Sequence, residues 1–450
     1  MKKVLLFSIV FLLAGAGVFA QIAEGNYFGI RGTVSFMPLE WQLVDDPDVN
    51  RKTEDDFKVA LGQPWGGTFG RIYFMAKGQN NLGGYEATFF TDNGDFKIEL
   101  ANVWINPISW LNIRFGRFMD TTLQGKVYPN DFRHFVLRTF NDTTGFDLEH
   151  AIFDYFRGGK NTLGGAMLSV TPIDNISVHL LLPDILGGIN PFATEQASGG
   201  EDANAKNVYS NFVAAAGYRI DNIGLARLQY VGRKKIDFEG NAELMAFGIR
   251  YYPSYQDFSR IEAAFQYTGL ENMIFDFGIK YAIPLSGDYT VVPGGGSLKA
   301  FYNPGVMFGL GARIEMGDLT VTFNGTGLFG NGYKVTGDYE NEHSFGVNMK
   351  FSLIPEYKFS FGTVGMNIGL DVKGKEKEND NELTTGKIDF GIGAWYKLEL
   401  ASRFTLWTGF SYTYVGLEEG DVPWLHKPSA PLITPSGFLR IPIIIDVNFL

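Results

Sequence analysis

The amino-acid sequence predicts an all-β protein, a transmembrane antiparallel up-and-down β-barrel with an even number of strands. Three observations carry this prediction: strand-length segments in which apolar and polar residues alternate, connections that are alternately short and long, and an unusual composition. The 450 residues include 56 Gly, 40 Phe and no Cys, so Gly is far more frequent than the roughly 7% of average proteins. The lack of Cys excludes disulfides, thiolate metal sites and cysteine nucleophiles.

The chain is acidic overall. It has 38 Lys and Arg against 49 Asp and Glu, which gives a formal net charge of −11. A nucleic-acid partner is not expected, because neutralising phosphates requires clustered Lys and Arg.

The N-terminus has the pattern of a secretory signal peptide. Lys2 and Lys3 precede an apolar run over 4–13, and small residues lead to Ala20. We expect cleavage after Ala20, so that 1–20 is a signal peptide and 21–450 a single barrel domain. An uncleaved membrane anchor is the alternative, but the run is short for a spanning helix, and we find no later stretch of about 18 apolar residues.

Strict alternation of apolar and polar residues recurs along the rest of the chain. In 344–353 every second residue is large and apolar, and the residues between them are small or polar. The apolar positions are Phe345, Val347, Met349, Phe351 and Leu353. Such segments fit either a soluble sandwich or a membrane barrel. Most reach the roughly nine to eleven residues that a spanning strand needs, so we expect the apolar face to contact lipid.

The strands assigned by this pattern number 20, with 18–20 as the best estimate and 16–22 as the range. An even count follows if both termini lie on the side of the short turns. The weakest strand is 286–293, and losing its hairpin gives 18, whereas folding part of 119–160 into the wall gives 22. The assigned strands lie at about 25–36, 67–77, 82–91, 95–106, 110–118, 161–171, 175–183, 208–220, 224–232, 241–252, 258–268, 273–283, 286–293, 298–315, 318–329, 343–354, 357–371, 386–399, 402–415 and 436–450.

The connections alternate between short turns and long polar loops. This asymmetry is typical of barrels in the outer membrane of diderm bacteria, where the protein would contact outer-membrane lipid. The expected short turns are 106–109, 172–175, 221–223, 253–257, 316–318, 355–356 and 401–402. The expected long extracellular loops are 37–66, 119–160, 184–206, 330–342, 373–386 and 417–435.

One hairpin resembles a known family. Over 103–118 a Trp-bearing strand turns at Pro107 and returns to end in Gly116-Arg117-Phe118, and 166–183 repeats the turn more loosely. This is similar to porin-like outer-membrane proteins of spirochaetes. The resemblance implies a porin-like barrel that is placed in the membrane by the barrel-insertion machinery. Such proteins usually end in an aromatic residue, and this chain departs from that pattern because Leu450 follows Phe449.

Basic residues outnumber acidic ones on the faces assigned to the lumen. A ring of cations favours anions in a water-filled pore, so we expect weak anion preference; alternatively, these cations pair with acids on neighbouring strands and hold the wall together. The candidate pore-lining residues are Arg31, Arg71, Lys97, Arg114, Arg219, Arg250, Arg260, Lys280, Arg313, Lys350, Lys397 and Arg403. The acidic residues assigned to these faces are Glu99, Glu262, Asp276, Glu315, Asp389 and Glu399.

The loop 119–160 mixes charges of both signs and follows the fifth assigned strand. It could fold inward as a constriction loop, or it could be an ordinary surface loop. The constriction candidates are Asp120, Lys126, Asp131, Arg133, Arg138 and Asp142.

We therefore expect a porin or diffusion channel for small hydrophilic solutes, with no metal, cofactor or enzymatic activity. Ser177 and His179 share a strand face, but no orienting acid is evident beside them. Trp395 and Trp407 fall on lumen faces by parity, where they could stack a sugar. The alternative function is a closed barrel whose long loops serve adhesion or surface interaction. The sequence leaves the oligomeric state open, a homo-oligomer included.

Overall fold

The computed structural model describes most of the expected strands. The described residues are 27–43, 58–60, 70–92, 95–120, 156–157, 165–183, 212–232, 258–291, 296–330, 332–337, 341–378, 381–384, 387–401, 404–414 and 437–449. Their regular elements are all β-strands. Among these residues there is no helix with the length and hydropathy needed to cross a membrane.

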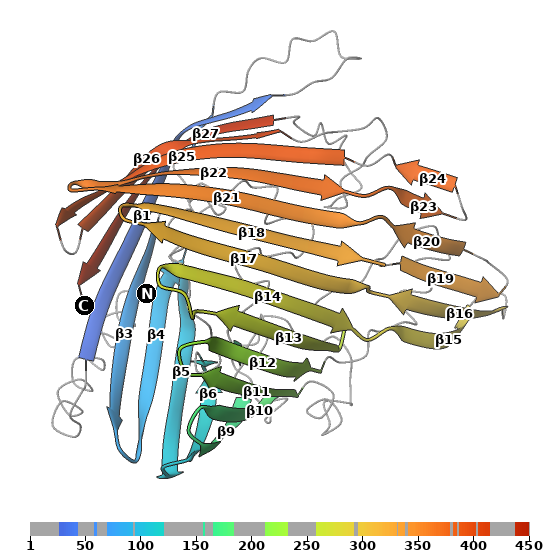
Figure 1. Cartoon of the computed structure of the whole chain (residues 1–450), viewed down its shortest axis with the longest axis horizontal. Helices are drawn as coiled ribbons and strands as arrows, with labels where there is room; N and C mark the ends of the chain where they lie inside the picture. Colours follow the sequence, from blue (N-terminus) through green and yellow to red (C-terminus); the bar gives the residue numbers. More distant parts are fainter. Residues whose placement is uncertain are drawn as a thin grey trace.

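Eighteen strands of the described chain form a closed antiparallel ring (Figure 1). The ring closes because β1 pairs with β3 on one side and with β27 on the other. A nineteenth strand of the same sheet, β2 (Lys58–Ala60), pairs only with the far end of β1. In pairing order the ring is β1 (Tyr27–Leu43), β3 (Gly70–Asn80), β4 (Gly83–Asp92), β5 (Asp95–Ile108), β6 (Leu111–Arg117), β9 (Gly165–Ile173), β10 (Ile176–Pro183), β11 (Val213–Ile220), β12 (Gly224–Val231), β13 (Arg260–Tyr267), β14 (Met273–Ala282), β17 (Val306–Met316), β18 (Leu319–Phe329), β21 (Asn348–Phe359), β22 (Gly362–Lys373), β25 (Lys387–Ala401), β26 (Phe404–Tyr414) and β27 (Gly437–Phe449).

The even count agrees with the predicted barrel, but one of the 20 assigned strands is not in the wall and another lies outside the described residues. The segment 286–293 falls in β15 (Leu285–Val291), which belongs to a different sheet, because β14 pairs directly with β17. The segment 241–252 lies outside the described residues, and β12 pairs directly with β13. Alternation alone identifies a strand without showing which strand it pairs with.

The two faces of the wall differ as the alternation predicts. On β14 the side chains of Phe275, Phe277, Ile279 and Tyr281 are exposed, Phe277 by 52%, whereas Asp276 between them and Ala282 after them are buried. In a closed ring the exposed face is the outer one, so the wall presents Phe, Ile, Leu, Val and Tyr outward and its polar residues inward. This is the arrangement of a transmembrane barrel.

Asparagine shapes several of the tight turns that join wall strands at one rim. Asn175, Asn222 and Asn272 adopt the left-handed conformation, with φ of 73°, 57° and 63°, which Asn tolerates better than most residues. Their turns also bond to neighbouring strands, as when the Arg219 amide donates to the Asn175 carbonyl at 2.8 Å. The predicted turn at 172–175 is confirmed at Asp174–Asn175, and 221–223 joins β11 to β12.

The predicted turn 316–318 is confirmed at Gly317–Asp318, whereas other predicted turns shift or lie outside the described residues. The turn expected at 355–356 is wrong, because β21 continues to Phe359 and the chain reverses at Ser360–Phe361. Pro355 stands inside the strand, opposite Val321 of β18. Proline has no backbone N–H to donate to the neighbouring strand. The hydrogen bonds of the other residues of β21 are enough to keep this segment in the sheet. The turn expected at 253–257 lies outside the described residues.

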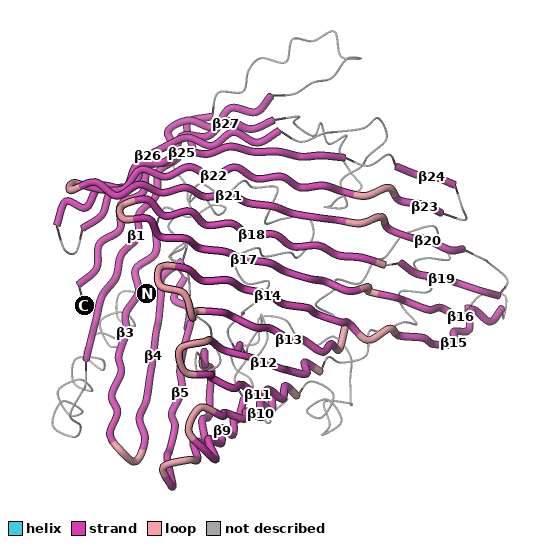
Figure 2. The backbone as a smooth tube through the Cα atoms, viewed as in Figure 1, coloured by secondary structure: helices cyan, strands magenta, loops and turns pink. Residues whose placement is uncertain are grey.

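Six short strands extend part of the wall beyond its loop-side end (Figures 1 and 2). Their pairing follows that of the wall strands next to them in the chain. For example, β16 precedes β17 and β19 follows β18, and β16 pairs with β19 as β17 pairs with β18. Pro304 and Gly305 interrupt the chain between β16 and β17, and Gly305 has φ of 82°. The six strands, called the extension below, are β15 (Leu285–Val291), β16 (Gly296–Asn303), β19 (Gly332–Gly337), β20 (Asn341–Phe345), β23 (Glu376–Glu378) and β24 (Asn381–Thr384).

The extension corrects two of the predicted loops. The ranges 330–342 and 373–386 were expected as loops, yet they contribute β19, β20, β23 and β24. Their strands are short and polar, and they become regular because each continues a paired wall strand.

The other expected loops are described only in part or lie outside the described residues. β1 extends to Leu43 within 37–66, and β7 (Met119–Asp120) pairs with β8 (Phe156–Arg157) within 119–160. The loops 184–206 and 417–435 lie outside the described residues.

The apolar outer face yields a stability prediction. Phe277→Arg places a charge near the middle of β14, and we expect the free energy of unfolding to fall by about 2–4 kcal/mol, the cost of Arg near the centre of a bilayer. The measurement is urea unfolding from phosphatidylcholine bilayers. Phe301→Arg is the matched control, because Phe301 is also exposed but lies on β16 of the extension. This variant should lower the free energy of unfolding by less than about 1 kcal/mol. If both variants lowered the free energy of unfolding equally, the prediction that β14 lies in the bilayer and β16 lies outside it would be contradicted.

Candidate functional site

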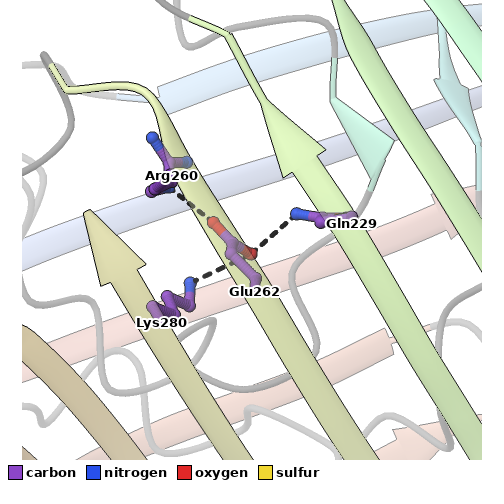
Figure 3. Close-up of polar contacts among 4 residues, drawn as sticks. All are labelled: Gln229, Arg260, Glu262 and Lys280. Atoms are coloured by element: carbon purple, nitrogen blue, oxygen red, sulfur yellow. Dashed lines mark hydrogen bonds and ion pairs between the residues drawn. The ribbon is translucent and has the colours of Figure 1, made fainter. Parts of the chain in front are cut away.

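A cluster of charged and polar side chains lies on the inner face of β12, β13 and β14 (Figure 3). Its centre is the Glu262 carboxylate, whose side chain is only 4% exposed. Arg260 Nε donates to Oε1 at 2.5 Å, Gln229 Nε2 donates to Oε2 at 2.7 Å, and Lys280 Nζ lies 3.7 Å from Oε2. Both oxygens of the buried acid are therefore engaged by donors from three adjacent strands. We call these four residues the Glu262 cluster.

Register and alternation assemble the Glu262 cluster. Gln229, Glu262 and Lys280 are directly opposite one another across the three strands. Arg260 precedes Glu262 by two residues and so shares its face. All of the side chains therefore project to the same side of the sheet, at the end of β12 and the start of β13, which is the loop side of the barrel.

A second charged group lies on β21, β22 and β25. Lys350 Nζ is 3.6 Å from Asp371 Oδ2, and the two side chains are 2% and 1% exposed. Asp389 of β25 is directly opposite Asp371 and is fully buried. Like charges in opposite positions repel, so the contact between Lys350 and Asp371 offsets part of that repulsion.

Two further ion pairs and two cation–π contacts lie nearer the short-turn end. Arg313 pairs with Glu315 at 2.9 Å and Lys397 with Glu399 at 3.5 Å. The Lys397 ammonium also lies 4.9 Å from the centre of the Trp407 ring. The corresponding contact on β5 and β6 places the Arg114 guanidinium 4.9 Å from the Trp104 ring.

The inward tryptophans pack against the wall. Trp395 covers Gly365 on the neighbouring strand, and a Cβ at Gly365 would collide with the indole ring. Trp395 and Trp407 are 2% and 4% exposed. They face inward as parity indicates, but their burial leaves no ring surface for the sugar-stacking role considered from the sequence.

The structure pairs five of the candidate pore-lining cations with acids: Arg260, Lys280, Arg313, Lys350 and Lys397. These contacts agree with the alternative that cations hold the wall by pairing. The five contacts involve only four acids, because Arg260 and Lys280 share Glu262.

The remaining candidates are less closely defined. Lys97 and Arg219 are exposed, Arg114 lies against Trp104, and for Arg31 and Arg71 only the backbone position in β1 and β3 is described. Arg250 and Arg403 lie outside the described residues. Of the constriction candidates, Asp120 is in β7, and those outside the described residues are Lys126, Asp131, Arg133, Arg138 and Asp142.

The inward charged residues that the sequence analysis missed include Arg227 and Asp371, which are 4% and 1% exposed. The alternation itself contained the signal, because Arg227 precedes Gln229 by two residues and Asp371 follows Gly369 by two.

The described inner wall also contains a histidine contact. His179 Nδ1 lies 2.8 Å from Ser169 Oγ on the neighbouring strand, so the structure places Ser169, rather than Ser177, against His179. Within the described residues, no three His, Asp or Glu side chains gather in a group that could hold a metal ion.

Comparison with known proteins finds no matching family model and no matching curated protein. Solved structures that match include a BenF-like porin from Pseudomonas fluorescens Pf-5, with 10% identity, a TM-score of 0.45, and coverage of 95% of this chain and 99% of that one. OmpT, an outer membrane protein of Vibrio cholerae, matches with 10% identity, a TM-score of 0.43 and coverage of 95% and 99%. An anion-selective porin from Comamonas acidovorans matches with 12% identity, a TM-score of 0.40 and coverage of 94% and 100%.

The buried pair on β21 and β22 yields a second stability prediction. Lys350→Met removes the cation beside Asp371, and we expect a loss of about 3–5 kcal/mol in the free energy of unfolding, as for one partner of a buried ion pair. Lys334→Met is the control, because Lys334 and Glu342 form an exposed pair in the extension, worth at most about 1 kcal/mol. Adding Asp371→Leu to Lys350→Met should recover most of the loss. Urea unfolding of all three variants measures these effects, and equal losses in the two single variants would refute the assignment.

Proposed function

We propose that the protein is an outer-membrane channel through which small hydrophilic solutes diffuse. The observation that carries this proposal is the closed ring of 18 wall strands with an apolar outer face and a polar, charged inner face. Barrels of 16–18 strands are wide enough to leave an aqueous channel. Passage by diffusion requires no cofactor and no covalent chemistry.

The charges of the inner wall support a weak preference for anions. Lys350 and Lys397 each have an acidic partner, which limits the field of these cations in the lumen. In the Glu262 cluster two cations share one acid, so positive charge is in excess there. The expected selectivity is therefore modest.

The rest of the proposal concerns the route to the membrane. Residues 1–20 would direct export as a signal peptide, and the barrel-insertion machinery would recognise the final strand. The exposed outer side chains would contact outer-membrane lipid, and a homo-oligomer is compatible with this arrangement.

A second candidate function is a closed barrel that interacts with other surfaces through its loop side. The observation in its favour is the extension, which carries six strands beyond the wall. The near-complete burial of Lys350, Asp371 and Asp389 also supports an inner wall that is shielded from water at this part. Conductance distinguishes the two functions, because only a channel passes current.

The channel is tested in planar lipid bilayers with a salt gradient. Refolded protein should give stepwise currents and a small reversal potential of the sign expected for anions. Lys280→Glu should move the reversal potential toward cation selectivity, because it reverses a charge on the inner wall. Lys334→Glu in the extension is the control and should leave it unchanged. Absence of current steps would favour the closed barrel, and clear cation selectivity of the native protein would contradict the anion preference.

A further inference from the structure

Four apolar side chains on the inner face of β3, β4 and β5 are only half-buried, and we call them the Tyr73 patch. Its members are Tyr73, Met75, Phe90 and Leu100. Ile72, which precedes Tyr73, is 47% exposed on the outer face, so Tyr73 and Met75 project inward. Phe90 is directly opposite Tyr73, and Leu100 is opposite Thr88, which shares the face of Phe90. The patch therefore faces the lumen from three adjacent strands.

An aromatic pair forms the centre of the Tyr73 patch. The ring centroids of Tyr73 and Phe90 are 5.5 Å apart, and the ring planes are inclined by 29°. Met75 is opposite Thr88 on one side and Gly29 of β1 on the other, and the glycine adds no side chain that could cover the patch. The pair thus presents a continuous apolar surface with a thioether beside it.

This patch differs from the other aromatic side chains of the inner wall. Trp104, Trp395 and Trp407 are 8%, 2% and 4% exposed, so little of their ring surface is left for a solute. Tyr73 and Phe90 are half-buried instead. Apolar surface that faces water gains free energy when it is covered, and in the lumen a passing solute can cover it.

Charged residues border the Tyr73 patch. Lys97 is opposite Phe90 and is exposed, and the backbone of Arg31 is opposite Tyr73. Toward the short turns, Lys77 and Glu86 are opposite each other and half-buried. Solutes that differ only in their ring, and carry the same charges, therefore separate the contribution of the patch from that of its charged neighbours.

We propose that the Tyr73 patch binds the ring of small aromatic solutes. Aromatic rings attract one another in offset-stacked and edge-to-face arrangements, beyond the effect of buried area, and the thioether of Met75 also makes favourable contacts with rings. A sugar fits less well, because Phe90 and Leu100 have no polar atom to bond its hydroxyl groups and the Met75 sulfur accepts only weakly. The inference rests on the proposed channel, for which it names a solute class.

The first test measures block of the channel by L-phenylalanine. At constant ionic strength, L-phenylalanine should reduce the chloride current of the native protein in a saturable way. L-cyclohexylalanine carries the same charges on a saturated ring, and its half-blocking concentration should be about two- to tenfold higher, the value of an aromatic contact. Glucose, the sugar control, should produce no saturable block.

Variants on both faces of β4 locate the site. Phe90→Leu removes the inward ring and should raise the half-blocking concentration of L-phenylalanine about two- to tenfold. Tyr73→Leu should have the same effect, and Phe90→Tyr should retain the block because it keeps a ring. Phe89→Leu is the matched control: Phe89 adjoins Phe90 but faces outward, where it stacks on Phe96 at 5.4 Å. Its loss should shift the half-blocking concentration less than twofold.

The second test measures binding without conduction. Saturation-transfer NMR of refolded protein, in a detergent that has no aromatic ring, should show transfer to the ring protons of L-phenylalanine. Phe90→Leu should weaken this transfer and Phe89→Leu should leave it unchanged. Binding without any current would support the site while overturning the channel.

Three outcomes would overturn the site. The first is a channel that L-phenylalanine neither blocks nor binds, which would leave the channel itself standing. The second is equal weakening by Phe90→Leu and Phe89→Leu, because it would show a general effect on the barrel. The third is block by L-cyclohexylalanine or glucose at concentrations equal to or below that of L-phenylalanine, because the patch would then not select aromatic rings.

Discussion

The structure depends on the pairing of the first wall strand with the last. In hydrocarbon an unbonded amide or carbonyl costs several kcal/mol, so a sheet that crosses the membrane cannot leave an open edge. β1 and β27 remove that edge through a register that extends from Ile30 opposite Phe449 to Leu43 opposite Gly437. Because all neighbours in the ring are antiparallel, closure also requires an even number of strands.

Closure decides what each face of the wall must be. The outer face meets lipid, which explains the exposed Phe, Leu and Ile side chains. The inner face collects nearly all of the buried polar groups, and these need partners from neighbouring strands. Glu262 obtains them from β12, β13 and β14, and Asp371 obtains Lys350 from β21. The ion pairs are thus a consequence of placing charges on the inside of a barrel.

The described wall strands differ in length. The wall strands β10 to β13 have eight residues each, whereas the strands from β14 to β25 are longer and continue into the extension. The Glu262 cluster lies at the loop-side ends of β12 and β13. The extension continues the neighbouring wall strands from β14 to β25, and Lys350 and Asp371 are buried in that part of the wall. The wall therefore contains one group of ion pairs whose cations are partly exposed and another that is almost completely buried.

The sequence by itself determined the faces of the strands and the class of fold. Alternation is a local property, so Phe275, Phe277 and Asp276 could be assigned to their faces without any knowledge of neighbours. The same period placed Arg260, Lys280 and Lys350 inward, and it could have placed Arg227 and Asp371 there as well.

Only the tertiary structure decided which strands pair and which acids meet which cations. Pairing depends on register between segments far apart in the chain, and a shift of one residue would turn every side chain to the other face. For this reason the sequence could not show that 286–293 leaves the wall, that Pro355 stands inside a strand, or that Lys280 reaches Glu262. The charge balance of the lumen was likewise undetermined, because it depends on contacts between strands and not on the number of charges in the chain.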